Sequence, residues 1–183
     1  MLVVYDPTTG EIIGHCSRVF DNGKWREATI EEIFPERDRS KLEALYLKDD
    51  PRYLIQGTEH WRIRREESGA VVGLERLPAI TLSCDASDHD NDGIPDLPAD
   101  GTSTTKITAK LDDDAKVDVT FRTTRGSLSK RTVRTTAKGQ ATVELRAATE
   151  TVAVIVTATA PGYRPATLHL EFIPLAAGPS VVF

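Results

Sequence analysis

Threonine accounts for 15 of the 60 residues between positions 101 and 160, and polar and apolar residues alternate along much of this segment. Threonine is branched at Cβ, which restricts its side chain in a helix and suits it to the pleated surface of a strand. An alternation of period two places every second side chain on the same face of a strand. The pattern therefore predicts β-strands with one buried face and one solvent-facing face.

Seven strands are predicted in the C-terminal half, with turn residues between most of them. Six strands are expected at residues 80–84, 105–111, 117–121, 141–145, 152–158 and 166–172, and residues 124–128 are expected to form a turn that leads into a seventh, short strand. The segment 152–158 is the most apolar of the seven, so it is predicted to lie in the centre of a sheet. Seven strands in about 95 residues are typical of an immunoglobulin-like β-sandwich.

The first 78 residues have a different composition, because they hold both tryptophans, three of the four tyrosines and the only methionine. A β-hairpin is predicted from strands at 2–5 and 11–16, since Pro7 and Gly10 suit the turn between them. A second turn is expected at residues 21–25. Further strands are predicted at 52–55, 61–65 and 70–74.

Two short helices are also predicted in this half. Thr29 is placed to cap a helix over residues 30–34, which Pro35 ends. Residues 39–47 are predicted as a second helix, because their apolar side chains fall on one helical face. The first 78 residues are therefore expected to form a small α+β module.

The predicted fold class is mainly β, with three parts. Residues 1–78 form the α+β module, residues 79–174 form the immunoglobulin-like sandwich, and residues 175–183 form an apolar tail. The tail ends on Phe183 and would be adhesive if it were exposed to solvent. It either docks into a neighbouring subunit or packs on its own domain.

Charge and cysteine content argue against several classes of protein. The chain has 28 acidic and 23 basic residues, a net charge of −5, which disfavours nucleic acid as a main partner. Cys16 and Cys84 are too few for a disulfide framework. No apolar stretch approaches the ~18 residues of a membrane helix, so no membrane partner is expected. The N-terminus lacks the pattern of a secretory signal, which predicts synthesis in the cytosol.

The strongest candidate site is the acidic segment 88–96, which reads Asp-His-Asp-Asn-Asp-Gly-Ile-Pro-Asp. Ca²⁺ takes 6–8 oxygen ligands, and carboxylates at alternate positions converge when a loop curls. The predicted ligands are the carboxylates of Asp88, Asp90, Asp92 and Asp96 and the backbone carbonyl of Ile94. Gly93 at the sixth position permits the sharp turn. The segment resembles the calcium loops of thrombospondin type 3 and dockerin-like repeats, which implies a structural Ca²⁺ that holds the loop.

The segment departs from those loops at position 12, where Ala99 replaces the bidentate acid. Asp85 and Asp100 are the candidates to complete the ligand shell. The alternative is a flexible acidic loop without a metal, in which the close carboxylates repel one another. No nucleophile, general base, phosphate-binding glycine motif or zinc-like histidine spacing accompanies the segment, so the chain is not expected to be an enzyme.

Residues 79–173 resemble the bacterial immunoglobulin-like domains of the invasin and intimin type. The resemblance rests on four stretches in order: 99–109, 119–128, 135–143 and 154–160. The acidic turn 112–114 departs from the longer turn of that family. The resemblance implies the sandwich fold, while domains of this kind serve as stalks, adhesive modules and virion decorations alike.

Residues 1–78 resemble, in outline, short virion proteins of bacteriophages. The matching pieces are 1–6, 52–57 and 74–78. The resemblance implies a non-enzymatic virion protein, made in the host cytoplasm, whose N-terminal module anchors to the capsid or tail and whose immunoglobulin-like domain projects outward. Its expected partners are other virion proteins, further copies of itself and a host cell-surface glycan. The alternative is a stalk or adhesive module of a bacterial surface adhesin.

Overall fold

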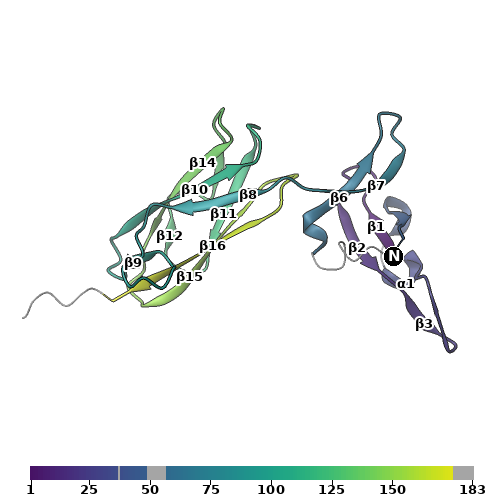
Figure 1. Ribbon diagram of the computed structural model, residues 1–183, viewed down its shortest axis with the longest axis horizontal. Coiled ribbons are helices and arrows are strands. Elements are labelled where there is room, and N and C mark those ends of the chain that lie inside the picture. Colours follow the sequence, from purple (N-terminus) through teal and green to yellow (C-terminus); the bar gives the residue numbers. More distant parts are fainter. Residues whose placement is uncertain (37, 49–56, 175–183) are drawn as a thin grey trace, which may run out of the picture. The chain divides into compact units, whose positions relative to one another are not determined.

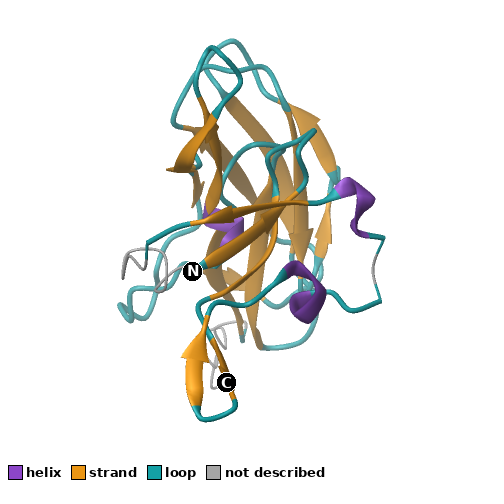
Figure 2. Ribbon diagram, turned by 90° about the vertical axis from the view of Figure 1, so that its right-hand side faces the viewer, coloured by secondary structure: helices purple, strands orange, loops and turns teal. Residues whose placement is uncertain are grey.

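The computed structural model describes residues 1–36, 38–48 and 57–174, and the chain divides into two compact units, Met1–Leu77 and Pro78–Phe183 (Figure 1). The strand predicted at 52–55 and the tail at 175–183 lie outside the described residues. Strands make up most of the regular structure (Figure 2). None of the described helices is long and apolar enough to cross a membrane.

The N-terminal unit contains seven short strands and one short α-helix in its described part. They are β1 (Leu2–Tyr5), β2 (Ile12–Cys16), β3 (Val19–Asp21), β4 (Lys24–Arg26), α1 (Ile30–Ile33), β5 (Glu43–Tyr46), β6 (Trp61–Arg65) and β7 (Val71–Arg76). Two 3₁₀ helices, Arg39–Lys41 and Thr58–His60, complete the set. The strands form an antiparallel sheet of order β2-β1-β5 and the two hairpins β3-β4 and β6-β7.

The central strand β1 is buried on both faces, which explains its uninterrupted apolar sequence. Val3 packs with Met1 and Ile12 on one face, with Leu47, Trp61 and Leu74 around them. Leu2 and Val4 pack with Ala28 on the other face, beside the helix α1. Because successive strand residues point to opposite faces, this single strand supplies the centre of two small cores.

The predicted hairpin turns are confirmed. Between β1 and β2, the Asp6 carboxylate accepts hydrogen bonds from the backbone N–H groups of Thr8 and Thr9 at 2.7 and 3.2 Å. Between β3 and β4, Asn22 and Gly23 both have positive φ, at 49° and 81°. Two consecutive positive φ angles match the twist of a two-residue hairpin, which is why Asn-Gly is favoured there.

The helix predicted at 30–34 is confirmed as α1, and the Glu32 carboxylate accepts a hydrogen bond from Thr29 N–H at 2.9 Å. The helix predicted at 39–47 is wrong. A 3₁₀ turn covers only Arg39–Lys41, and the strand β5 follows it. β5 pairs along the whole of β1, so that Leu2 lies opposite Tyr46 and Tyr5 lies opposite Glu43. The second edge of β1 needs backbone partners, and this requirement outweighs the weak helical pattern.

The second unit is a sandwich of two sheets. Its strands are β8 (Ile80–Cys84), β9 (Asp96–Pro98), β10 (Thr104–Leu111), β11 (Asp118–Thr123), β12 (Ser127–Leu128), β13 (Thr132–Arg134), β14 (Gln140–Arg146), β15 (Val152–Thr159) and β16 (Ala166–Ile173). One sheet has the order β12-β14-β10-β8 and the other β13-β11-β15-β16-β9. This division agrees with the two sheets of immunoglobulin domains, so the predicted immunoglobulin-like sandwich is confirmed.

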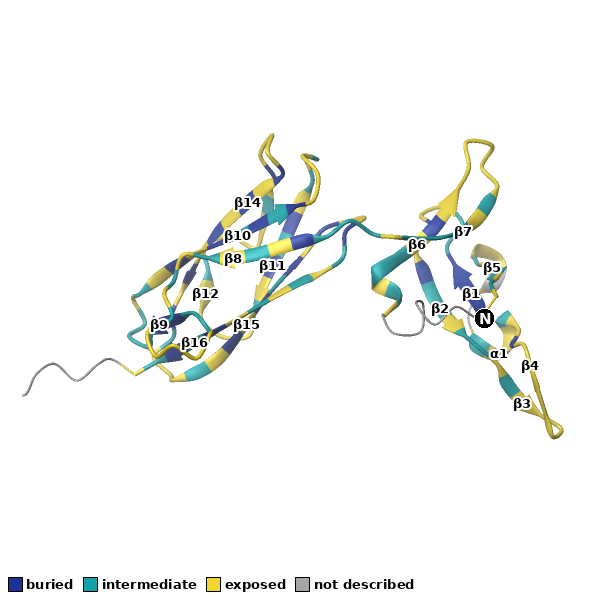
Figure 3. Cartoon of the chain, in the orientation of Figure 1, coloured by how far each residue is buried: buried dark blue, intermediate teal, exposed yellow. Residues whose placement is uncertain are grey.

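The core of the sandwich consists of the inward-facing side chains of its strands. Buried and exposed residues alternate clearly along β14 (Figure 3). Phe121, Phe172, Ile107 and Leu145 are all fully buried. Threonines occupy outward positions and meet across strands, for example Thr108 with Thr142 on neighbouring β10 and β14, with hydroxyl oxygens 3.2 Å apart. The threonine content of the sequence therefore reflects the solvent-facing sides of two sheets.

All seven predicted strands of this unit are present, and β15 lies in the middle of the five-stranded sheet as predicted. Two more strands, β9 and β13, were not predicted, because each has only three residues. β9 pairs in parallel with the end of β16. A further parallel bridge joins Ala79 to Arg164. Two segments from the first part of the unit, at Ala79 and at β9, therefore pair in parallel with its last part.

Candidate metal centre

The predicted calcium segment lies in the loop that connects the two sheets of the sandwich. β8 before it belongs to the four-stranded sheet, and β9 after it belongs to the five-stranded sheet. Asp96, the last predicted carboxylate ligand, is the first residue of β9. A contact between Asp96 and the preceding loop therefore fixes the loop against the edge of the second sheet.

The loop is curled by hydrogen bonds from its own backbone to its aspartates. Asp88 accepts from the N–H groups of Asn91 and Gly93, both at 2.8 Å. Asp90 accepts from Asp92 N–H at 3.2 Å. The φ angle of Gly93 is +91°, which is the left-handed region that glycine enters most easily. The sharp turn predicted at Gly93 is confirmed.

The curled loop brings together three of the five predicted ligands. One carboxylate oxygen each from Asp88, Asp90 and Asp96 lies within 4.8 Å of the others. Asp88 is partly buried, Asp90 is exposed and Asp96 is buried. These three side chains form the carboxylate cluster of this unit.

Asp96 is the buried member of the carboxylate cluster, and its side chain is 1% exposed. Its Oδ2 accepts a hydrogen bond from the backbone N–H of His89 at 2.7 Å. The His89 ring nitrogen Nδ1 lies 3.8 Å from the same oxygen, at a side chain that is largely exposed. His89 thus helps to hold the buried carboxylate of the cluster.

The pKa of Asp90 shows the balance of charge in the cluster. The hydrogen bond from Asp92 N–H lowers this pKa, but desolvation and the negative charges of Asp92, Asp96 and Asp88 raise it by more. The net pKa is raised above its usual value. The negative potential at Asp90 therefore favours a positive partner.

The other two predicted ligands are arranged differently. Asp92 is exposed and its Oδ1 accepts from Ile94 N–H at 2.8 Å, so it shapes the loop from outside the carboxylate cluster. Ile94 is partly buried on the chain just before β9. A role for the Asp92 carboxylate and the Ile94 carbonyl as ligands stays a prediction.

The two residues considered for completing the shell are engaged elsewhere. Asp85 accepts hydrogen bonds from Thr105 Oγ1 and Lys106 N–H, both at 2.7 Å, and the first of these chiefly lowers its pKa. Asp100 accepts from Thr102 N–H and from Ser103, and the Ser103 backbone bond chiefly lowers its pKa. Asp85 thus joins the end of β8 to the neighbouring strand β10, whereas Asp100 accepts hydrogen bonds within its own turn.

The carboxylate cluster fits a calcium ion by distance and by chemistry. Two oxygens bound to one Ca²⁺ at 2.3–2.6 Å can be no more than about 5.2 Å apart, and the three clustered oxygens satisfy this limit. All three are hard oxygen donors, which suit Ca²⁺ better than the softer transition metals. Three carboxylates supply half or less of a calcium shell, so backbone carbonyls and water would supply the rest.

Of the comparisons with known proteins, only the one with solved structures found similar chains. No protein-family model matches the chain, and none of the curated proteins matches it. The C-terminal 282-residue fragment of intimin, solved with the intimin-binding domain of the translocated intimin receptor, is 27% identical with a TM-score of 0.42; the match covers 51% of this chain and 33% of that chain. The D0-D1 domain of intimin is 26% identical with a TM-score of 0.43, covering 52% of this chain and 48% of that one.

Enzymes also contain similar regions. A β-glucuronidase of glycoside hydrolase family 2 is 13% identical with a TM-score of 0.44, and the match covers 97% of this chain but 18% of the enzyme. The chain thus spans a third to a half of the intimin fragments and under a fifth of the enzyme. At these TM-scores the immunoglobulin-like assignment rests on the strand order and register of the second unit.

Proposed function

We propose that this chain is a non-enzymatic structural protein of a bacteriophage particle. Its N-terminal unit binds capsid or tail subunits, and its immunoglobulin-like unit projects outward. The chain would act as a homo-oligomer in the virion after synthesis in the host cytoplasm. The observation that carries the proposal is an exposed aromatic pair on the N-terminal unit.

The aromatic pair consists of Phe20 on β3 and Trp25 on β4. The two residues lie opposite each other in the hairpin, are 62% and 66% exposed, and have ring centroids 5.2 Å apart. Large aromatic side chains are the usual anchors of protein interfaces, because they bury much apolar area with little loss of side-chain freedom. An aromatic pair held this far into solvent therefore supports a protein partner for the N-terminal unit.

The backbone of the same hairpin supports this choice of partner. β3 and β4 pair only with each other among the described strands, so the outer edge of each offers N–H and C=O groups. A subunit that adds a strand to such an edge gains backbone hydrogen bonds as well as the aromatic contacts. The proposed partner is a structural subunit of the particle that has its own exposed sheet edge.

The calcium loop has a structural role in this proposal. A Ca²⁺ held by Asp88, Asp90 and Asp96 would neutralise the carboxylate cluster and hold the connection between the two sheets. The ion contributes rigidity to the projecting unit. No reaction step is assigned to it.

The test is to purify the source particles and measure the copy number of this chain by mass spectrometry. A high copy number supports the proposal. Absence from particles, together with recovery from a bacterial surface, overturns it in favour of an adhesin module. Release of the chain by an EDTA wash would assign the calcium loop a role in attachment as well.

A matched pair of variants then tests the anchor. The double variant Phe20→Ser with Trp25→Ser should lower the copy number on particles at least tenfold, because both interface anchors are removed. Val72→Ser on β7 changes another exposed apolar residue of the same unit and should leave the copy number unchanged. Equal copy numbers for both variants would exclude the aromatic pair as the anchor.

A further inference from the structure

The most basic segment of the chain lies in the second unit. Residues 119–138 contain six lysines and arginines and no aspartate or glutamate, although the whole chain has a net charge of −5. The segment covers β11, β12 and β13 with the loops between them. A local excess of positive charge in an acidic protein points to a negatively charged ligand.

The segment crosses the edge of the sandwich twice. β11 and β13 belong to the five-stranded sheet, whereas β12 between them pairs with β14 of the other sheet. The return is fixed by a hydrogen bond from Phe121 N–H to the Arg131 carbonyl at 2.7 Å. A pocket lies between β11 and the chain that runs through β12 to the start of β13.

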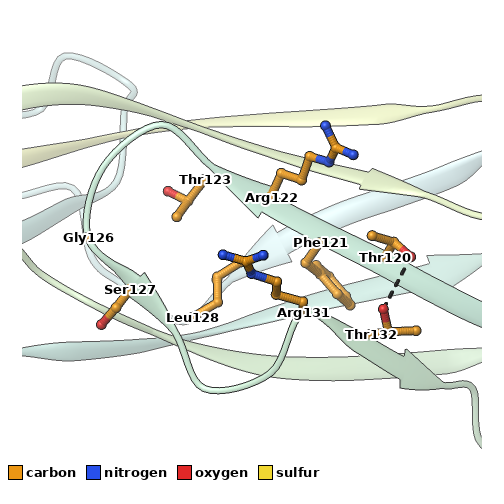
Figure 4. A pocket seen from close by; sticks show the side chains of 9 residues that line it. All are labelled: Thr120, Phe121, Arg122, Thr123, Gly126, Ser127, Leu128, Arg131 and Thr132. Carbon is orange, nitrogen blue, oxygen red and sulfur yellow. Dashed lines mark hydrogen bonds between the residues drawn. The ribbon is translucent and has the colours of Figure 1, made fainter.

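The pocket has a volume of about 740 Å³, which is within the range of small-molecule sites. Its charged lining consists of Arg122 on β11 and Arg131 just before β13, and its lining contains no acidic residue. In Figure 4 the Arg131 guanidinium lies in the space between Thr123 and Leu128, while the Arg122 side chain extends to the other side of β11, away from Arg131. Phe121 and Leu128 give the pocket an apolar side.

The two arginines keep their charge available. Among the described residues, neither guanidinium forms an ion pair or a hydrogen bond to a protein acceptor. Arg134, by contrast, lies 3.6 Å from the Asp118 carboxylate, and Arg125 donates to the Thr124 carbonyl. The unpaired arginines of the segment are thus the ones that line the pocket.

The rest of the lining is rich in hydroxyl groups. Thr120, Thr123, Ser127 and Thr132 all contribute to it, and the Thr120 and Thr132 hydroxyls lie 3.3 Å apart. Guanidinium groups bind carboxylate and sulfate in a bidentate manner, and hydroxyls both donate and accept hydrogen bonds. This combination matches a sugar that carries acidic groups.

We propose that this pocket binds an acidic saccharide, one bearing carboxylate or sulfate groups. A pocket of this size accepts one or two sugar rings and is too small for a folded protein surface. A long nucleic acid would need a basic surface that continues beyond the pocket, whereas Arg134 is paired with Asp118 and Arg125 donates to the Thr124 carbonyl. The inference rests on the proposed outward position of the immunoglobulin-like unit, where such a saccharide on a host surface would be met.

The test is calorimetric titration of the purified full chain with a sulfated uronic-acid disaccharide at low salt. Binding should weaken as sodium chloride is added, because salt screens the charge interaction. Arg131→Ala should weaken binding about tenfold or more, the effect expected for a lost hydrogen bond to a charged group. Lys138→Ala removes a basic residue of the same segment outside the pocket and should change affinity less than twofold.

Two comparison ligands and a fold control complete the experiment. The same disaccharide without sulfate and carboxylate should not bind, and inorganic sulfate should bind at least tenfold more weakly than the acidic disaccharide. Each variant must keep the melting temperature of the parent chain. Absence of binding by the parent chain, equal losses in Arg131→Ala and Lys138→Ala, or equal affinity for sulfate alone would overturn the proposal. The copy number of the chain on particles does not depend on saccharide binding. The saccharide proposal and the proposed function can therefore fail separately.

Discussion

The hydroxyl of Tyr163 donates a hydrogen bond to Asp113 Oδ1 at 2.6 Å, which joins the loop before β16 to the loop between β10 and β11. Tyr163 is buried, and Asp113 lies in the acidic turn 112–114. A Cβ at Gly139 would meet the Asp113 carbonyl oxygen, so a third loop packs closely there. The acidic turn is therefore a packed junction of three loops.

Tyr163→Phe should lower the melting temperature of the second unit by roughly 4–8 °C, because it removes one partly buried hydrogen bond and leaves the ring in place. Differential scanning calorimetry of the full chain checks this. Tyr46→Phe is the control, since Tyr46 is exposed and its hydroxyl is 3.5 Å from its acceptor. Equal shifts in the two variants would contradict a structural role for the Tyr163 bond.

The same bond predicts a dependence of stability on pH. Desolvation first, and then the hydrogen bond to Asp113, raise the pKa of Tyr163 to about 12. This contribution is present below the usual pKa of 10 and is lost as pH rises through about 12. The bond from Tyr163 lowers the pKa of Asp113, so its contribution is present above pH 3.8 and is lost as pH falls through the lowered pKa. Melting temperatures of Tyr163→Phe should vary less than those of the parent chain in both ranges.

Calcium should raise the melting temperature of the second unit, because an ion that binds only the folded state stabilises it. Asp90→Asn combined with Asp96→Asn should abolish the rise, since two of the three clustered carboxylates are lost. Differential scanning fluorimetry with calcium chloride, magnesium chloride and EDTA measures the effect.

Asp92→Asn separates the predicted ligand set from the carboxylate cluster. Asp92 lies outside the cluster and its Oδ1 accepts from Ile94 N–H, which an asparagine oxygen can replace. This variant should keep most of the calcium response. A full loss in Asp92→Asn, or an unchanged response in the double variant, would show that the ion is bound elsewhere in the loop.

Thr135→Val should destabilise the second unit by about 1–3 kcal/mol, although the two side chains have nearly the same shape. Thr135 is buried, accepts from Val117 N–H at 2.9 Å and donates to the Ala115 carbonyl at 2.6 Å. Valine would leave the Val117 N–H and the Ala115 carbonyl without the hydroxyl to which they bond. Thr142→Val on the exposed face should cost less than about 0.5 kcal/mol in the same urea titration.

Gly126→Ala should destabilise the unit more than Gly162→Ala does. Both glycines have positive φ, at 74° and 80°, so alanine is strained in either place. At Gly126 the added Cβ would also meet the Arg146 carbonyl oxygen and lie 2.9 Å from Phe172 Cζ, whereas nothing lies within 4 Å at Gly162. Urea unfolding of the two variants measures the difference, and equal losses would exclude a packing role for Gly126.

The sandwich was predictable from sequence because its strands are long and their alternation is regular. β10, β15 and β16 each have eight residues, enough for period two to stand out. β5 was mispredicted because Leu42, Leu45 and Tyr46 are spaced as on a helix, and its strand character comes from pairing with β1, far away in the sequence. Local patterns cannot show such a pairing.

The same distinction between local patterns and long-range contacts applies to the candidate sites. The aspartate spacing identified Asp88, Asp90 and Asp96 directly, because ligands within one loop are close in sequence. The engagement of Asp85 with Thr105 depends on a neighbouring strand and was not visible. The arginine pocket had a signal in the absence of acids from residues 119–138, but only the path through both sheets places Arg131 beside β11.

The two parallel contacts at the ends of the second unit have a mechanical consequence. Ala79 bridges Arg164, and Asp96–Pro98 pairs with the end of β16. Parallel segments pulled at opposite ends are sheared, so their hydrogen bonds carry a load together and do not open one by one. Tension that enters at Pro78 and leaves at Pro174 would act on both contacts in this way, and the sandwich would withstand stretching along its own chain.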